Sequence, residues 1–156
     1  MAVRTLLVAC TLFLGMCLIT SSRPTETTQA FCNIEWLLAL PCAQVNKAIV
    51  TEIKSLKNIY KLGTVTPLQI QANHTSAPGQ MEQVNFTMTP AAMGEGCRLH
   101  GFSMSAVWYS SFSNSTNYCN LQTVVNGSGL TKTPGFMEFT NEWRCLGLED
   151  AACPSK

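Results

Sequence analysis

The chain contains few of the side chains on which most enzymes depend. Its 156 residues include only two histidines, His74 and His100, and a single aspartate, Asp150. Histidine is the usual general base near neutral pH, so little material is present for acid–base catalysis. No Gly-x-Ser-x-Gly elbow or His-Glu-x-x-His helix occurs, and one aspartate cannot build a calcium cage. The sequence therefore predicts a protein without catalytic, cofactor or metal-binding residues.

The two histidines and the paired glutamates have simpler explanations than catalysis. His74 lies inside a glycan acceptor triplet, where a sugar would crowd a substrate. His100 lies in a predicted strand on the side of Phe102, and we interpret it as a structural histidine. Glu138 and Glu142 alternate with apolar residues and are expected on a solvated strand face. A secreted hydrolase is therefore the weakest of three functional hypotheses.

Charge is also scarce, because Asp, Glu, Lys and Arg make up 12% of the residues and the formal net charge is +1. Removal of an N-terminal signal segment takes Arg4 away and leaves nine basic against nine acidic residues. A nucleic-acid-binding domain needs a basic patch, so a nucleic-acid partner is not expected. Four lysines gather in one segment, where they fit the solvated face of a helix: Lys47, Lys54, Lys57 and Lys61.

Long apolar runs are missing apart from one near the start of the chain. It spans Leu6 to Ile19, follows Arg4 and precedes Thr20-Ser21-Ser22, which is typical of a secretory signal peptide. A membrane span needs about 20 apolar residues. The C-terminal sequence "GLEDAACPSK" lacks the hydrophobic tail of a lipid-anchor signal. We expect a signal peptide over residues 1–22 and one secreted, extracellular domain over 23–156, with 23–31 as a flexible arm and no membrane span.

Cysteine, by contrast, is abundant. Two of the eight cysteines lie in the signal segment, and six remain in the mature chain: Cys32, Cys42, Cys97, Cys119, Cys145 and Cys153. An even number in a secreted chain predicts three disulfides, and no Cys-x-x-Cys spacing supports a zinc site. Six cysteines allow 15 pairings. The segmentation of the chain favours sequence neighbours: Cys32–Cys42, Cys97–Cys119 and Cys145–Cys153.

One segment has a clear helical period. Apolar residues recur at steps of three or four between Cys42 and Leu62, at Val45, Ile49, Ile53, Leu56 and Tyr60. Pro41 suits the start of a helix and Gly63 its C-terminal cap. This pattern predicts an amphipathic helix. The segment before it, "FCNIEWLLALPC", is expected to be an anchored segment or a short helix.

Strand-like alternation follows the helix. It occurs in residues 65–75, 81–88, 97–112 and 136–146, while "YCNLQTVV" fits a short strand or a helical turn. The alternation is expected to send the larger apolar residues to the core: Phe102, Met104, Trp108, Met137, Phe139 and Trp143. The order of elements predicts an α+β fold, with one N-terminal amphipathic helix on a four- or five-stranded antiparallel sheet. A small β-sandwich with a helical decoration is the alternative.

Four Asn-x-Ser/Thr triplets follow the signal peptide, and they begin at Asn73, Asn85, Asn114 and Asn126. Asn85 alternates with Val84, Phe86 and Met88, so the strand phase turns it away from the core. Asn73 shares its phase with polar neighbours, and the other two lie in polar turns. All four are expected at the surface, as N-glycosylation requires.

The layout of signal peptide, helix, strands and C-terminal disulfides resembles that of cystatins. The Gln-x-Val-x-Gly loop and the Pro-Trp hairpin of that family are absent, so the resemblance implies no inhibitory residue here. The sequence favours a secreted N-glycosylated protein that binds an unidentified extracellular protein. A carrier that holds a small apolar ligand between helix and sheet is the alternative.

Overall fold

The computed structural model describes residues 29–76, 79–92, 96–105, 116–149 and 151–153. The predicted signal peptide and most of the predicted arm lie outside these ranges, as do Trp108, Asn114 and Asp150. The last residue of the predicted arm, Phe31, already belongs to the first strand.

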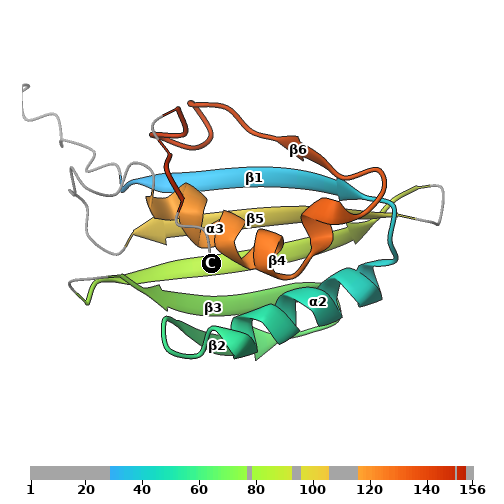
Figure 1. Ribbon diagram of the computed structural model, residues 1–156, viewed down its shortest axis with the longest axis horizontal. Coiled ribbons are helices and arrows are strands. Elements are labelled where there is room, and N and C mark those ends of the chain that lie inside the picture. Colours follow the sequence, from blue (N-terminus) through green and yellow to red (C-terminus); the bar gives the residue numbers. More distant parts are fainter. Residues whose placement is uncertain (1–28, 77–78, 93–95, 106–115, 150, 154–156) are drawn as a thin grey trace, which may run out of the picture.

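The described chain forms a six-stranded antiparallel sheet with two helices (Figure 1). The elements in chain order are β1 (Phe31–Leu38), α2 (Cys42–Ser55), β2 (Tyr60–Val65), β3 (Gln69–Thr75), β4 (Met81–Pro90), β5 (Cys97–Ser105), α3 (Thr116–Gly127), a 3₁₀ turn (Leu130–Lys132) and β6 (Met137–Phe139). The strands follow the order β2-β3-β4-β5-β1-β6. The α+β class is confirmed, and the sheet has more strands than predicted.

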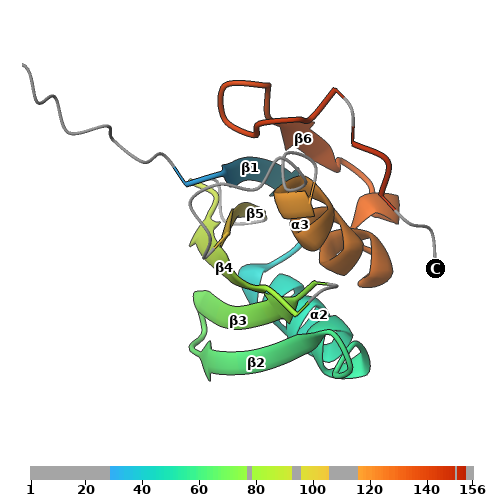
Figure 2. The same cartoon turned by 90° about the vertical axis from the view of Figure 1, so that its left-hand side faces the viewer.

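Both helices lie on the same side of the sheet, as the turned view in Figure 2 shows. The core lies between them and the sheet, where Trp36 and Phe86 are the largest fully buried side chains. The ring of Trp36 explains why residue 101 is a glycine. A Cβ atom on Gly101 would lie 2.6 Å from the Trp36 ring and 3.2 Å from Leu121 of α3, so only glycine lets α3 and the indole ring pack this closely.

The first strand contradicts the expectation of an anchored segment or a short helix. β1 lies inside the sheet, between β5 and β6, and pairs with β5 from Phe31 opposite Met104 to Leu38 opposite Cys97. Its residues alternate between buried and half-buried positions. The alternation is hidden in the sequence because both faces carry apolar side chains, such as Trp36 on one and Leu37 on the other.

The predicted helix is confirmed over its first part only, because α2 ends at Ser55. Its buried residues include Val45, Ile49 and Ile53, which belong to the predicted stripe. The backbone then turns, with the amide of Ile59 bonded to the carbonyl of Leu56, and Tyr60 opens β2. Tyr60 belongs to a strand, but it is buried in the same core as the apolar residues of α2. Its position in the sequence therefore matched the helical period.

A second helix, α3, replaces the predicted short strand or helical turn. Its buried residues fall at helical spacing, at Asn117, Asn120, Leu121, Val124 and Val125. Two of these inward residues are asparagines, so the apolar stripe by which a helix is recognised is interrupted. This is why the sequence pattern fails to identify α3.

On β5 the predicted core face is wrong. The buried residues are Cys97, Leu99, Gly101, Ser103 and Ser105, whereas Phe102 and Met104 are half-buried on the opposite face. Gly101, Ser103 and Ser105 have small side chains or none because the Trp36 ring and the asparagines of α3 occupy the space above them.

Three disulfides are present, as predicted, but the pairing of sequence neighbours is wrong. The bonds join Cys32 to Cys145, Cys42 to Cys97, and Cys119 to Cys153. Two of these pairs follow the sheet directly: Cys32 lies opposite Cys145, and Cys42 follows the end of β1, which pairs with the start of β5. No helix in the described part of the chain is long and apolar enough to cross a membrane.

Candidate functional site

The face of the sheet opposite the helices, here called the open face, falls into two halves. The polar half, on β2, β3 and β4, carries mainly amide and hydroxyl side chains: Gln69, Gln71, Asn73, Gln83, Asn85 and Thr87. The apolar half, on β5, β1 and β6, carries Phe31, Leu37, Phe102, Met104, Met137 and Phe139. Phe31 and Phe102 stack with their ring centroids 6.3 Å apart, and Glu35 pairs with Arg98 at 3.0 Å.

The segment after β6, here called the Trp143 loop (residues 140–149), presents an unusual side chain. Trp143 is 89% exposed, although tryptophan is among the most buried residues on average. The backbone beneath it is fixed. The carboxylate of Glu142 accepts hydrogen bonds from the amides of Gly147 and Glu149, and the Cys32–Cys145 disulfide ties the loop to β1.

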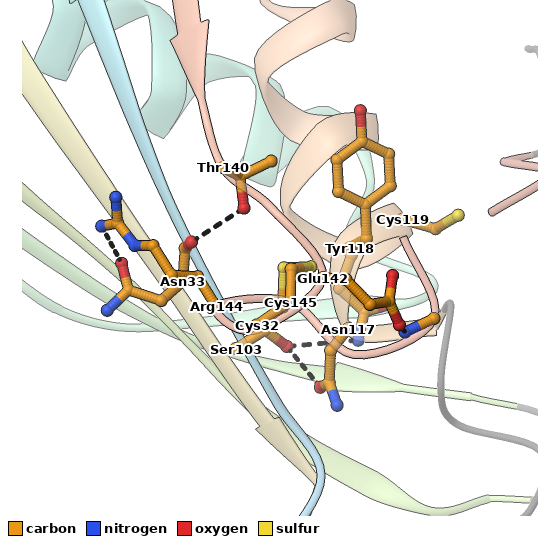
Figure 3. The surroundings of a disulfide bond; sticks show 12 residues. Cys32, Asn33, Ser103, Asn117, Tyr118, Cys119, Thr140, Glu142, Arg144 and Cys145 are labelled. Atoms are coloured by element: carbon orange, nitrogen blue, oxygen red, sulfur yellow. Dashed lines mark hydrogen bonds between the residues drawn. A yellow bond between two sulfur atoms is a disulfide. The ribbon is translucent and has the colours of Figure 1, made fainter. Parts of the chain in front are cut away.

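A second set of contacts anchors the same loop to β1 through Asn33 (Figure 3). The backbone amide of Asn33 donates to the backbone carbonyl of Arg144 at 2.8 Å. Thr140 donates its hydroxyl to the Asn33 carbonyl at 3.1 Å, and the Arg144 guanidinium donates to Asn33 Oδ1 at 2.9 Å. The loop therefore holds its conformation without help from the Trp143 side chain.

His100 joins this cluster on the open face. Its Nε2 lies 2.7 Å from Asn33 Oδ1. Arg144 also donates to that oxygen, and an amide oxygen only accepts, so Nε2 carries the hydrogen of the neutral ring. Burial and the Arg144 charge lower the pKa of His100, while Glu35 opposes the shift. The imidazole is therefore neutral at pH 7 and serves as a hydrogen-bond donor to Asn33.

The faces of β6 are the reverse of those predicted. Met137 and Phe139 are 50% and 45% exposed, whereas Glu138 faces α3 beneath the sheet edge. Its carboxylate accepts hydrogen bonds from Trp36 Nε1 at 2.7 Å and from the Tyr118 hydroxyl at 3.1 Å. Glu138 lies opposite Trp36 in the register, and a buried indole N–H needs an acceptor. Burial and the Glu138 charge raise the pKa of Tyr118 to about 12. Glu142, also predicted to be solvated, is half-buried in its loop.

A buried polar network that the sequence analysis missed links α3 to the sheet. At its centre is Glu82, which is 2% exposed and whose Oε2 accepts hydrogen bonds from Asn120 and from His74 Nδ1, the latter at 2.9 Å. The Tyr60 hydroxyl donates to the Asn120 carbonyl at 2.7 Å. Burial and the charges of Glu82 and Glu52 raise the pKa of Tyr60. These groups bind one another across the interface between α3 and the sheet.

The expectation that a sugar on Asn73 would crowd a substrate at His74 is wrong. Asn73 and His74 are neighbours on β3, so their side chains lie on opposite faces, and a sugar on Asn73 would not crowd His74. Its imidazole packs instead against Tyr60, with a centroid distance of 4.7 Å. Across the described ranges, no group of three or more His, Cys, Asp or Glu side chains is placed to hold a metal ion.

Among the hollows at the surface of the described part of the chain, two bear on binding. The polar groove, of about 240 Å³, is on the open face and is lined by Gly63, Thr64, Gln71, Ala72, Asn73, Gln83 and Asn85. The end hollow, of about 510 Å³, lies where β1, β4 and β5 meet their connecting segments and is lined largely by apolar residues, among them Leu37, Leu38, Ala39, Pro90, Ala91 and Ala92.

The glycan acceptor residues lie at different kinds of position. Asn73 and Asn85 are half-buried on the polar half of the open face. Asn126 is exposed near the end of α3 rather than in a turn, and Asn114 lies outside the described residues. Glycosylation of these sites stays a prediction.

No family model matches the chain, and no curated protein sequence is significantly similar to it. Among solved structures, the crystal structure of TTHA0849 from Thermus thermophilus is similar to this chain. The match covers 63% of this chain and 93% of the TTHA0849 chain, with 10% sequence identity and a TM-score of 0.35. A similarity this distant carries no argument about function.

Proposed function

We propose that this is a secreted N-glycosylated protein that binds an extracellular protein partner through the apolar half of the open face and the Trp143 loop. The observation that carries the proposal is the 89% exposure of Trp143 on a loop fixed by a disulfide and by several hydrogen bonds. Tryptophan is enriched among the residues that dominate binding energy at interfaces. A rigid loop that presents one spares the partner the cost of ordering it.

The surroundings of Trp143 have the composition of an interface. Met137 and Phe139 are exposed on β6, shortly before Trp143 in the chain, and Leu146 is exposed beyond it. Arg98 and Glu35 supply charge beside these apolar residues. Aromatic residues, methionine and arginine are the types enriched at protein interfaces, and exposed apolar patches of this kind mark interaction sites.

Binding is favoured over catalysis because the candidate catalytic groups are already engaged. Glu82 Oε2 accepts from both Asn120 and His74, and His100 donates to Asn33. Secretion is supported by the three disulfides, since such bonds persist in oxidising compartments. The glycan part of the proposal is supported by Asn73 and Asn85, which lie on the face away from the core.

The carrier of a small apolar ligand remains the second proposal because one observation favours it. The end hollow has the size of typical ligand pockets, which span about 300–1,000 Å³. However, the predicted place for the ligand, between helix and sheet, contains the fully buried Trp36, Phe86, Leu99 and Leu121. An apolar fluorescent probe bound by the wild-type protein and lost on Ala91→Trp would support the carrier.

The binding proposal is tested by affinity capture from extracellular fluid with the mature glycoprotein. The Trp143→Ala variant is compared with the wild type, and Val65→Ala serves as a matched control because Val65 is exposed outside the proposed surface. We expect a captured protein that is retained by Val65→Ala and lost with Trp143→Ala. An identical set of captured proteins for all three would refute the proposal.

A further inference from the structure

We propose that the polar groove is a binding site for the protein's own carbohydrate, and that the first sugars of an N-glycan on Asn85 lie in it. This inference rests on the proposed glycosylation of Asn85. It goes further by assigning a ligand class, an N-acetylglucosamine core, to a site on the protein surface. The attachment point is itself part of the site, since Asn85 lines the groove.

The register of the sheet places the groove directly beside the acceptor. Asn85 on β4 pairs with Gln71 on β3. On the far side of Gln71 is Gly63 of β2, where a Cβ atom would lie 3.1 Å from the Gln71 carbonyl oxygen. A glycan leaving Asn85 toward the sheet edge therefore crosses Gln71 and reaches Gly63 and Thr64.

The polar groove exists because the row of residues that runs across the sheet from Asn85 through Gln71 ends at a residue without a side chain. Gly63 has none, and the pairing of β2 with β3 shifts register between Leu62 and Val65. Bulges of this kind bend a strand locally, and a glycine in a strand often marks the close approach of another group. The groove therefore ends at bare backbone on the side opposite Asn85.

The neighbouring acceptor, Asn73, also lines the groove, but its row across the sheet differs from that of Asn85. Asn73 pairs with Lys61 on β2 and with Gln83 on β4. In the row of Asn73, β2 carries a lysine, whereas in the row of Asn85 it carries the glycine Gly63. Strand neighbours on one face lie within about 5 Å of each other. Although both asparagines line the groove, only the row of Asn85 ends at a residue without a side chain, so we assign the groove to the glycan on Asn85.

The lining matches the chemistry of a sugar. Besides Asn85 it offers the side-chain amides of Gln71, Asn73 and Gln83 and the hydroxyl of Thr64. Each of these groups can donate and accept hydrogen bonds, as the hydroxyl and acetamido groups of N-acetylglucosamine can. An apolar ligand would leave these polar groups without partners, which is unfavourable.

The size of the groove favours a tethered ligand over a free one. Its volume of about 240 Å³ is below the roughly 300–1,000 Å³ usual for pockets that bind free small molecules. A covalent link raises the effective concentration of the sugar to the millimolar range or above. Contacts too weak to retain a free sugar therefore suffice for one attached at Asn85.

The test uses the full secreted protein, produced in animal cells, with the glycan labelled for NMR. Glycopeptide mapping first establishes whether Asn85 carries a glycan. Thr87→Ala removes the acceptor triplet while leaving Asn85 in place, and Thr87→Ser is the matched control that keeps the triplet. Thr87 is exposed on the open face, so both variants are expected to fold.

In the wild type and in Thr87→Ser we expect nuclear Overhauser contacts from the acetamido methyl group of the first sugar to Gly63 and Thr64. In Thr87→Ala, hydrogen exchange of β2 should become about fivefold faster, the effect of losing roughly one net hydrogen bond.

An occupied Asn85 whose sugar shows no contact to β2, or contacts Phe102 of β5 instead, would overturn the proposal while leaving glycosylation intact. An unoccupied Asn85 would overturn it together with the glycosylation on which it rests. Binding through Trp143 would be unaffected by either result.

Discussion

The two halves of the open face are parts of one sheet, yet they present different chemistry to the solvent. The polar half carries amides, hydroxyls and two glycan acceptors, Asn73 and Asn85. The apolar half carries aromatic, methionine and leucine side chains and leads to the Trp143 loop. The difference shows that one face of a sheet can combine a polar region that carries two Asn-x-Thr triplets with an exposed apolar region.

The largest expected difference between the two halves is in partner binding, and it is tested by removing the Trp143 side chain. Trp143→Ala should weaken partner binding by about 2–4 kcal/mol, which is roughly 30-fold or more, because the side chain is the most exposed anchor beside the apolar half. Stability should stay within about 0.5 kcal/mol of the wild type. Binding is measured by titration calorimetry with the captured partner. Gln71→Ala, on the polar half, is the control and should leave the affinity unchanged.

A change in the shared core should affect both halves together. Gly101→Ala places a methyl group 2.6 Å from the Trp36 ring, and overpacking of this kind costs about 1–3 kcal/mol. Denaturant unfolding measures the loss of stability. Trp36→Phe in the same chain removes the clashing part of the ring and should restore part of the loss. Unchanged stability of Gly101→Ala would contradict the packing described here.

A smaller and more local effect is expected from Glu138. Glu138→Ala leaves the Trp36 indole N–H and the Tyr118 hydroxyl without their acceptor, at a cost of about 1–2 kcal/mol. Hydrogen exchange should quicken in β6 and in the adjacent part of β1. Glu149→Ala is the control, because its exposed side chain lies outside this cluster. Equal quickening of β2 and β3 would show that the halves are not separable.

The smallest effect concerns pH. Burial and Arg144 hold the pKa of His100 below its usual value of 6.5, so the folded protein binds fewer protons than the unfolded chain just below that pH. Stability from this group is present at pH 7 and is lost as the pH falls from about 6.5 toward the folded pKa.

His100→Gln keeps a side-chain donor near Asn33 and does not titrate. Thermal unfolding at about pH 7.5 and about pH 5.5, on either side of the ordinary histidine pKa, should show a smaller acid-induced loss in this variant than in the wild type. If the two proteins lose the same stability on acidification, then His100 does not contribute to the pH dependence.

The parts of the fold that sequence reasoning reached are those where one periodic pattern dominates. The first turns of α2 follow an unbroken apolar stripe, and the alternation of Val84, Phe86 and Met88 with polar residues is confirmed in β4. Local patterns fail where tertiary partners decide. Asn117 and Asn120 face inward because Ser103, Ser105 and Glu82 bind them, and no local signal reveals such partners.

The candidate site was less accessible to sequence reasoning than the fold. Trp143 was expected in the core because it follows the period of β6, but that strand ends at Phe139 and the chain then turns into a loop. Glu138 was expected in water because no sequence rule pairs it with Trp36, which is 102 residues away. The disulfide pairs follow strand order, and strand order is set by the whole sheet.

The Cys32–Cys145 bond has a consequence for the order of events during synthesis and folding of the protein. Its two cysteines are 113 positions apart, near the two ends of the described chain. The polypeptide must therefore be synthesised at least through Cys145 before this bond can close and the Trp143 loop can take its place beside β1. A nascent, truncated or reduced chain would lack the completed loop, so the surface proposed for the partner would be available only on finished, oxidised copies.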